Sequence, residues 1–237
     1  MHRLGFTQEQ LPELIDLLKE QDVITPASVF THLSVADEPA QDEYTLMQFD
    51  YFDTCSEMLQ QAFGHQLMRH MLNSSGTVRF PERQYEMVRI GIGLYGIRTL
   101  FDGSEEALMP VSALRSVIIS IKEWPAGTTI GYGRHGVLER DSRIATVNIG
   151  YADGFDRHFG NGRVSMWVGG KLCPTVGNVC MDAVMIDVTG APCKVGDTVE
   201  IFGEHVPIEQ LSEARGTIPY EILTSVSPRV KRVYYRE

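Results

Sequence analysis

The sequence predicts an α/β fold in its first part and a β-rich fold in its second part. In the first part, strand-like runs such as Ser28–Leu33 alternate with helix-like stretches such as Asp42–Phe63, which is typical of parallel β/α units. In the second part, short strand-like runs follow one another with turn signals between them, which favours a β-barrel or a sandwich. The polar, proline-ended stretch Phe101–Pro110 lies between the two patterns, so we expect domains at residues 1–105 and 106–237.

The elements of the first domain each have a local signal. Thr7 and Gln10 have the spacing of a capping box, so a helix is expected directly after them. The long helix named above has apolar residues at helical spacing, and Gly64 is placed to end it. Gln66–Ser74 and Met87–Gly96 are strand-like. About three strands cannot close an eight-stranded barrel, so this domain is either an open sheet or part of something larger.

The second domain consists mainly of short strand-like runs. Gly169–Gly170 predicts a tight two-residue hairpin between two of them, and Pro207–Arg215 predicts one short helix. The strand-like runs are Arg115–Trp124, Arg143–Gly154, Arg163–Cys173, Cys180–Val188 and Asp197–Gly203.

Composition limits the class of protein. The chain has 237 residues, of which 43% are hydrophobic, and its net charge is −10, so nucleic acid and anionic membranes are not expected partners. No apolar run is long enough to cross a bilayer and no signal-peptide pattern opens the chain, so we expect a cytoplasmic protein. The four cysteines form no Cys-x-x-Cys pair and have no accompanying histidine pattern, so neither a zinc site nor a disulfide framework is expected.

Polar residues fall at or near the C-terminal ends of the first-domain strands, where β/α barrels carry their active sites. These residues are His32, Asn73, Ser74 and Arg89. The Ser74 hydroxyl, together with the backbone amides at Gly91 and Ile92, would suit a phosphate. The alternative is structural: the Gly-Ile-Gly run only allows close packing, and the histidine only makes a hydrogen bond within the fold.

Tyr132 stands between two glycines in the stretch TIGYGRHG, residues 129–136. Glycine is used where the backbone turns sharply or approaches another group closely. One interpretation is a hairpin turn beside an exposed aromatic ring. The other is a reactive tyrosine that is held at the tip of a loop.

Two further polar clusters follow in the second domain. Tyr151 heads a polar turn after a strand, and Met181 and Asp182 interrupt an otherwise apolar run. A buried aspartate must be paired or hydrogen-bonded. Asp182 is therefore expected to be a buried residue that stabilises the fold.

Seven short stretches contain these candidate residues: MHRLGF, VFTHLSVADE, HMLNSSG, VRIGIGLYG, GYGRHG, IGYADGFDR and GNVCMDAVMIDV. Together and in this order they resemble alanine racemase, a family of enzymes that use pyridoxal 5'-phosphate (PLP). They span nearly all of the chain. The sequence is therefore identified as a C-terminal portion of a member of that family.

The resemblance implies a fold and an activity. The fold is an eight-stranded (TIM-type) β/α barrel followed by a β-rich domain, and this chain would hold the second part of the barrel and the β domain. The activity is the interconversion of L- and D-alanine by two-base proton transfer, which supplies D-alanine for the peptidoglycan of the cell wall. The enzyme is a head-to-tail homodimer, in which the β domain of one subunit completes the barrel site of the other.

The resemblance also implies catalytic roles. Tyr132 matches the tyrosine base that enters the partner's site. An ordinary tyrosine has a pKa near ~10, so base action near neutrality requires a lower one. His32 and Arg89 match residues that help to lower it, and Arg89 also matches the arginine that faces the pyridine nitrogen of the cofactor. Because arginine keeps its proton, that nitrogen stays largely unprotonated, which favours reprotonation at Cα over transamination.

The remaining roles concern binding. Ser74, Asn73, Gly91 and Ile92 match the phosphate side of the cofactor site. Arg3 and the backbone of Met181 match groups that hold the substrate carboxylate, and Tyr151 matches a tyrosine at the active-site entrance.

Two departures from the family matter. The family's Schiff-base lysine lies upstream of the motif that is found here at residue 1, and no lysine of this chain stands in a matching context. Those lysines are Lys19, Lys122, Lys171, Lys194 and Lys231. In addition, Pro228 occupies the position of a tyrosine that contacts the cofactor phosphate in many members.

We therefore expect little or no racemase activity from this span alone, because only one of the two bases is present. Two alternatives stay open. The span is a non-catalytic dimerisation or binding module that derives from a racemase, or it belongs to a racemase for another amino acid, such as serine.

Overall fold

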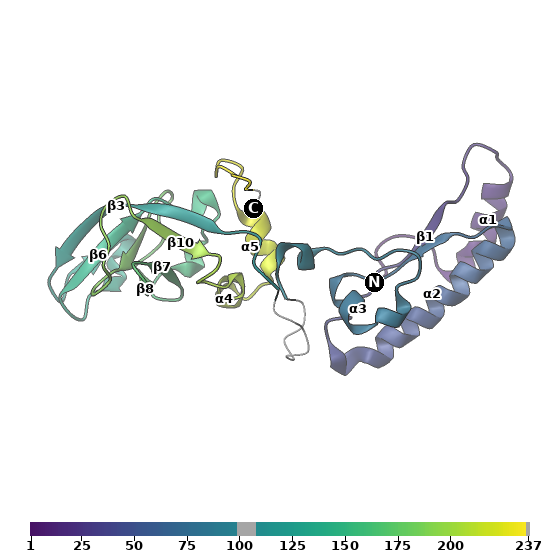
Figure 1. Cartoon of the computed structure of the whole chain (residues 1–237), viewed down its shortest axis with the longest axis horizontal. Coiled ribbons are helices and arrows are strands. Elements are labelled where there is room, and N and C mark those ends of the chain that lie inside the picture. Colours follow the sequence, from purple (N-terminus) through teal and green to yellow (C-terminus); the bar gives the residue numbers. More distant parts are fainter. Residues whose placement is uncertain (99–107, 236–237) are drawn as a thin grey trace. The chain divides into compact units, whose positions relative to one another are not determined.

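The structure is a computed structural model that describes residues 1–98 and 108–235 (Figure 1). The chain divides into two compact units, an N-terminal unit, Met1–Met109, and a C-terminal unit, Pro110–Glu237. The predicted boundary between residues 105 and 106 lies outside the described residues. No helix in the two described ranges is both long enough and apolar enough to span a membrane.

The N-terminal unit combines helices with a small parallel sheet. Its α-helices are α1 (Leu11–Lys19), α2 (Asp42–Phe63) and α3 (Ser74–Arg79), and its strands are β1 (Ser28–Phe30) and β2 (Met68–His70). Its 3₁₀ helices are Gln8–Gln10, Pro39–Gln41, Pro81–Arg83 and Ile92–Tyr95. The two strands pair in parallel, with Ser28 opposite Met68 and Phe30 opposite His70. An isolated parallel bridge between His70 and Met87 extends this order to a third segment.

The α2 helix packs on this sheet with one apolar face. Its buried residues recur every three or four positions: Thr45, Phe49, Phe52, Ser56 and Leu59. Val29 of β1 packs against a core cluster that contains Phe49 and Met71. Figure 1 shows α1 beside α2, and Leu11 of α1 shares a second cluster with Leu59.

Most of the elements predicted for this unit are confirmed. The capping box is present, since the backbone amide of Thr7 donates to Gln10 Oε1 at 2.9 Å, and α2 ends at Gly64, whose φ is 68°. The strand predicted over residues 87–96 is wrong beyond its first residue, because Ile92–Tyr95 is a 3₁₀ helix. The amides of Gly91 and Gly93 donate to the hydroxyl of Ser74, so they do not form a strand ladder.

The C-terminal unit is a closed antiparallel barrel of six strands, in the order β10-β3-β6-β9-β8-β7. Its strands are β3 (Leu114–Trp124), β6 (Ser142–Val147), β7 (Ser165–Val168), β8 (Lys171–Val176), β9 (Val184–Asp187) and β10 (Thr198–Phe202). Its core contains buried residues from all six strands: Ile118, Ala145, Val147, Met166, Val168, Cys173, Val184, Ile186, Val199 and Ile201. Of the two architectures that the sequence left open here, the barrel is the one observed.

Smaller elements complete this unit. Gly169 and Gly170 form the predicted hairpin, with φ of 58° and 76°, which a primed turn requires. The predicted helix is present as α4 (Ile208–Arg215), and a second helix, α5 (Pro219–Ser225), was not predicted. A separate two-stranded ribbon, β4 (Thr129–Ile130) with β5 (Gly136–Val137), encloses the loop that carries Tyr132.

Candidate active site

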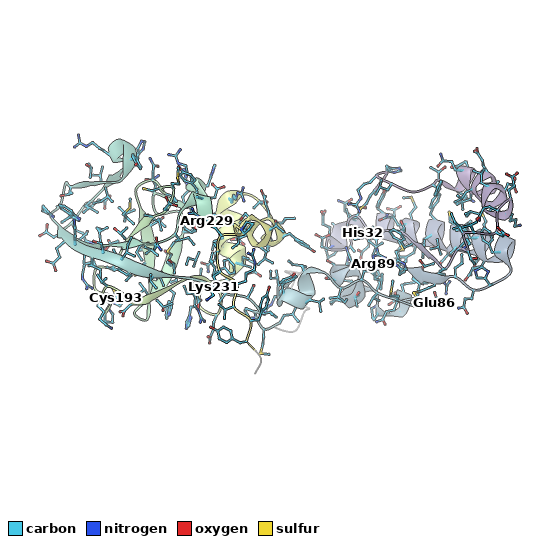
Figure 2. The ribbon with its side chains drawn as sticks, turned by 90° about the horizontal axis from the view of Figure 1, so that it is seen from above. His32, Glu86, Arg89, Cys193, Arg229 and Lys231 are labelled. Carbon is cyan, nitrogen blue, oxygen red and sulfur yellow. The ribbon has the colours of Figure 1, made fainter. Side chains whose placement is uncertain are left out.

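Arg89 lies at the centre of the candidate site in the N-terminal unit, next to His32 (Figure 2). Its Nη1 donates to the carbonyl of His70 at 2.9 Å, and its Nη2 donates to the carbonyls of Thr31 at 2.7 Å and Met71 at 3.3 Å. Nη1 also lies 2.7 Å from His70 Nδ1, and Nη2 lies 3.2 Å from His32 Nδ1. Among the described residues, every side-chain hydrogen bond of Arg89 uses Nη1 or Nη2, which leaves Nε–H for a ligand.

The Arg89 contacts fix the tautomers of both histidines. A guanidinium can only donate, so Nδ1 of each ring accepts and the ring proton sits on Nε2. Burial lowers the pKa of His32, and the charges of Arg89 and Arg3 lower it further. Burial and the charge of Arg89 also lower the pKa of His70. Both rings are therefore neutral near pH 7, and His32 offers Nε2–H as a donor.

The shape of this cluster comes from the small sheet. Thr31 and His32 follow β1, and His70 ends β2, so parallel pairing places them at one edge. Phe30 stacks on the His70 ring with 5.1 Å between centroids, and Arg89 Cζ lies 5.4 Å from the Phe30 centroid. An aromatic face that contacts both neighbours holds the guanidinium and the imidazole in place.

Ser74 links the start of α3 to the glycine-rich segment. Its buried Oγ accepts hydrogen bonds from the amides of Gly91 at 2.9 Å and Gly93 at 3.3 Å. A Cβ added to Gly93 would lie 3.5 Å from this Oγ. Asn73 is the N-cap of α3, and its Oδ1 accepts from the amide of Gly76 at 2.9 Å. Ile92 begins the 3₁₀ helix directly after Gly91.

Tyr132 lies in the C-terminal unit, on the loop between β4 and β5. Its side chain is 73% exposed, and φ is 77° at Gly131 and 70° at Gly133. The loop is thus a hairpin turn with an exposed aromatic residue, as one interpretation predicts. The same exposed position at a loop tip also fits the other interpretation, in which the tyrosine reaches a site outside its own loop.

Tyr151 and Met181 lie together in the C-terminal unit. The amide of Tyr151 donates to the carbonyl of Cys180 and the amide of Ala152 donates to the carbonyl of Met181, both at 3.0 Å. A Cβ on Gly150 would lie 2.3 Å from the Met181 oxygen, so only glycine permits this approach. The two segments that were matched to substrate handling therefore contact each other directly.

The prediction that Asp182 is a buried aspartate is wrong. Its side chain is 59% exposed, because Asp182 precedes β9 and does not lie inside a strand. Its pairing is as expected, since Arg229 Nη2 donates to Asp182 Oδ1 at 2.6 Å and Arg229 Nε donates to Asp153 Oδ1 at 2.7 Å. Pro228 directly precedes this arginine (labelled in Figure 2).

The structure therefore groups most of the predicted residues in three places, and Tyr132 lies separately on the loop between β4 and β5. His32 and Arg89 form one group, Ser74 and Gly91 a second, and Tyr151 and Met181 a third. Arg3 is exposed near the start of the chain. Sequence reasoning missed His70 as a partner of Arg89, although its position at the start of HMLNSSG, opposite Phe30 of β1, could have indicated it.

Comparison with known proteins places these groups in a family. The model of the alanine racemase N-terminal domain matches residues 1–99, and that of the alanine racemase C-terminal domain matches residues 111–234. The chain belongs to the alanine racemase family. The alanine racemase fold, a TIM-type barrel followed by a β domain, explains why a small β/α unit precedes a closed β-barrel here.

Individual alanine racemases are similar over nearly the whole chain. Those of Shewanella baltica (strain OS195) and Aeromonas hydrophila are each 36% identical to it, over 97% and 99% of this chain. The solved alanine racemase of Clostridium difficile 630 superposes with a TM-score of 0.91 at 37% identity, covering 99% of this chain and 62% of that one. The enzyme from Streptomyces lavendulae gives 0.90 at 30% identity, covering 100% and 64%. The chain spans 63% of the Shewanella relative and 64% of the Aeromonas one.

Proposed function

We propose that this chain forms part of a cytoplasmic, PLP-dependent alanine racemase. In this proposal it supplies one side of the cofactor site, part of the substrate site and one of two bases. The observation that carries the proposal is the setting of Arg89, a guanidinium that is held by three carbonyls and two neutral imidazoles. Membership of the alanine racemase family supports the same conclusion.

The residues present fit the ring of PLP. A pyridine nitrogen is a hydrogen-bond acceptor, and Arg89 Nε–H is a donor that the neighbouring protein groups leave available. Because arginine does not release its proton, the nitrogen would accept this hydrogen bond without being protonated. When bound, PLP withdraws electrons from the Cα of the amino acid and makes its proton removable.

The residues also fit the phosphate of PLP. The amides of Gly91 and Gly93 both lie within hydrogen-bonding distance of the Ser74 hydroxyl. Several converging N–H and O–H donors are the usual way for a backbone to hold an anion. Pro228 offers no side-chain hydroxyl, so we infer that the contact which a tyrosine makes there in many alanine racemases is absent.

Tyr132 is the proposed base. His32 has its proton on Nε2, so it can donate to the phenolate oxygen of a Tyr132 that enters from a second copy of the chain. The hydrogen-bond chain then runs from Tyr132 through His32 to the fixed charge of Arg89, which favours the ionised phenol. Arg3 and the backbone of Met181 would hold the substrate carboxylate, with Tyr151 at the entrance.

Racemisation requires a base on each face of Cα, and this chain supplies one of them. Lys19 is the only lysine before residue 110, and it lies at the last position of α1. We therefore propose that the chain alone does not racemise alanine. A head-to-tail homodimer that includes an upstream barrel lysine would be the active form.

Two ligands that differ by one group test the cofactor site. We expect the 237-residue chain to bind PLP more tightly than pyridoxal, which lacks the phosphate, when binding is followed by absorbance. Ser74→Ala should weaken PLP binding and leave pyridoxal binding unchanged. Equal affinity for the two ligands would contradict the phosphate assignment.

Borohydride trapping tests the missing base. The chain is incubated with PLP, reduced and digested, and any pyridoxyl-lysine is mapped by peptide mass. We expect no specifically labelled lysine and no racemisation of alanine or serine. A single labelled lysine with racemisation would show that a lysine within this chain has taken the role, and faster turnover of serine would indicate a different substrate.

A further inference from the structure

The loop that carries Tyr132 has few internal hydrogen bonds. Between β4 and β5, the amide of Arg134 donates to the carbonyl of Gly131 at 3.2 Å, and Arg134 Nε donates to Thr129 Oγ1 at 3.1 Å. Positive φ angles at Gly131, Gly133 and Arg134 make this a tight excursion of the backbone. A loop of this kind needs an external support if its side chain is to occupy one position.

Asn178 supplies this support from the strand connection that follows β8. Its Nδ2 donates to the carbonyl of Tyr132 at 2.9 Å. At the other end of the same amide, Asn178 Oδ1 accepts from Asn161 Nδ2 at 3.1 Å. The carbonyl of Tyr132 can only accept, so the orientation of the Asn178 amide is determined by both partners.

The backbone around this hydrogen bond is closely packed. A Cβ on Gly136 would lie 2.7 Å from the amide nitrogen of Gly177, and a Cβ on Gly177 would lie 2.5 Å from the carbonyl oxygen of Ile130. A Cβ on Gly131 would lie 3.4 Å from the amide nitrogen of Asn178. The two segments therefore touch along their backbones, and the side chain of Asn178 reaches over this contact to the residue at the loop tip.

The support is continuous with the substrate-handling segment. The run from Gly177 to Asp182 carries Asn178, which binds the carbonyl of Tyr132, and four residues later it carries Asp182, which pairs with Arg229. Between them, the carbonyls of Cys180 and Met181 bind the segment of Tyr151. One short stretch of chain thus fixes the position of Tyr132 relative to Tyr151 and Met181.

We propose that Asn178 is a positioning residue for the base Tyr132. This inference rests on the proposed function, because it requires Tyr132 to act on a proton. The Asn178 amide sets the position of the loop tip and so the distance between the phenol oxygen and the proton that it exchanges. Displacement of a catalytic group by about 1 Å can slow a reaction by on the order of 100-fold, even when the fold is intact.

The first test uses the 237-residue chain and needs no activity. Asn178→Asp keeps the size of the side chain and removes the donor, so its oxygen faces the carbonyl of Tyr132. We expect hydrogen–deuterium exchange over residues 129–137 to be faster than in the unaltered chain, with the barrel strands unaffected. Asn148→Ala is the matched control, because Asn148 is an exposed asparagine of the same unit whose contacts in the structure involve its backbone. Unchanged exchange in the Asn178→Asp variant would overturn the inference.

The second test uses the full enzyme, in which the upstream part of the β/α barrel, with its lysine, precedes this chain. Exchange of the Cα proton of L-alanine and of D-alanine in deuterated water is measured separately. Tyr132→Phe identifies the enantiomer whose exchange depends on the tyrosine. We expect Asn178→Asp to slow exchange of that enantiomer by roughly 10- to 100-fold, and the other much less.

The outcomes separate this inference from the proposed function. If Tyr132→Phe leaves both exchange reactions unchanged, the assignment of Tyr132 as a base fails, and the positioning role fails with it. If Tyr132→Phe is selective and Asn178→Asp slows both enantiomers equally or neither, only the positioning role fails. Asn178→Gln, which restores a donor, should recover part of the exchange rate that Asn178→Asp loses for the Tyr132-dependent enantiomer.

Discussion

The two units stabilise their functional residues in different ways. In the C-terminal unit, six strands close into a barrel, and the segments around Tyr132 and Tyr151 attach to it through backbone contacts. In the N-terminal unit, the only regular sheet among residues 1–98 has two strands, and the carbonyls that surround Arg89 belong to the ends of these strands. A barrel has no free edges, whereas a two-stranded sheet is not stable by itself.

We infer that the N-terminal unit depends on side-chain contacts such as those of Arg89 more than the closed barrel does. The surface of the N-terminal unit includes large apolar side chains, such as Leu4, Val23 and Phe30, the last of which is 65% exposed. We expect the N-terminal unit to be the less stable of the two when the chain is studied alone.

The chain offers separate probes for the two units. Both tryptophans, Trp124 and Trp167, lie in strands of the C-terminal unit, so their fluorescence reports on the barrel. The 22-residue helix α2 dominates the helical circular dichroism signal and belongs to the N-terminal unit. Two transitions that do not coincide would show that the units unfold independently.

The largest effect is expected from Arg89→Ala. This change leaves three carbonyls and two imidazoles without their donor, so we expect the N-terminal unit to lose about 3 kcal/mol of unfolding free energy. Urea titration should show the loss in circular dichroism and not in tryptophan fluorescence. Arg83→Ala, which removes a partly exposed ion pair with Asp53, is the control and should cost about 0 to 1 kcal/mol. Equal shifts in both signals would show that the comparison between the units is wrong.

Gly150→Ala should act on the other unit. Its Cβ would lie 2.3 Å and 2.4 Å from the carbonyl oxygens of Met181 and Cys180, so the two loops must separate. We expect a loss of about 1 to 3 kcal/mol, seen in tryptophan fluorescence. Gly196→Ala, which has a φ of 92° and open space around its Cβ, separates backbone strain from steric overlap. An unchanged midpoint for Gly150→Ala would mean that the loops are free to move apart.

Acidification should lower the unfolding free energy of the N-terminal unit through two of its histidines. Because the pKa values of His32 and His70 are lowered, the unfolded chain binds protons below about pH 6.5 that the folded N-terminal unit does not bind. The unfolding free energy of this unit should therefore fall as pH falls from about 6.5 towards the pKa values of the two histidines in the folded unit. Above about pH 6.5, these two histidines should not change the unfolding free energy. A His32→Gln, His70→Asn double variant should remove this dependence when circular dichroism midpoints are compared at pH 7 and pH 5.5.

A second acid window should follow at lower pH. Hydrogen bonds from Arg69 lower the pKa of Glu86 to about 2, so the stability that this carboxylate contributes is present above its ordinary pKa and is lost as pH falls towards 2. For the variant that lacks His32 and His70, the acid window of this unit would therefore lie in this lower range.

The smallest effect on stability is expected from Arg229→Ala. Arg229 and its partner Asp182 are about half exposed, so the fluorescence midpoint should move little, although the second partner, Asp153, is only 16% exposed. Local dynamics should change more, because Arg229 pairs with Asp153 and Asp182 and so attaches its own segment to two loops beside the barrel strands. We expect faster exchange of the Ser227 amide, which donates to the carbonyl of Asp153 at 2.9 Å, and no change with Lys231→Ala.

Local signals predicted much of the fold. The bounds of α2 follow from its apolar spacing and from Gly64, and the hairpin follows from Gly169–Gly170, because in each case the deciding interactions lie within a few residues. Residues 87–96 were predicted less well, since the amides of Gly91 and Gly93 bind a hydroxyl that lies 17 and 19 residues away. The helix α5 has seven residues, which is too short for a helical period to be recognised.

The sequence predicted which residues belong to the candidate site better than it predicted which of them contact each other. Sequence motifs selected Arg89, His32 and Ser74, but no local pattern shows that His70 also accepts from Arg89. The exposure of Asp182 was missed for a related reason, because β9 begins only after this residue and its partner Arg229 lies 47 positions away. Contacts of this range depend on the assembled sheet and barrel.

The hydroxyl of Ser74 has a consequence for the speed at which the protein takes up its ligand. By accepting from the amides of Gly91 and Gly93, this one oxygen acts as a placeholder for an anion, so the loop is already folded in the shape that a phosphate would require. In the proposed cofactor site, a phosphate would meet amides that already point towards one oxygen, so its binding would require no refolding of the loop. Association should accordingly be a single fast step with no lag.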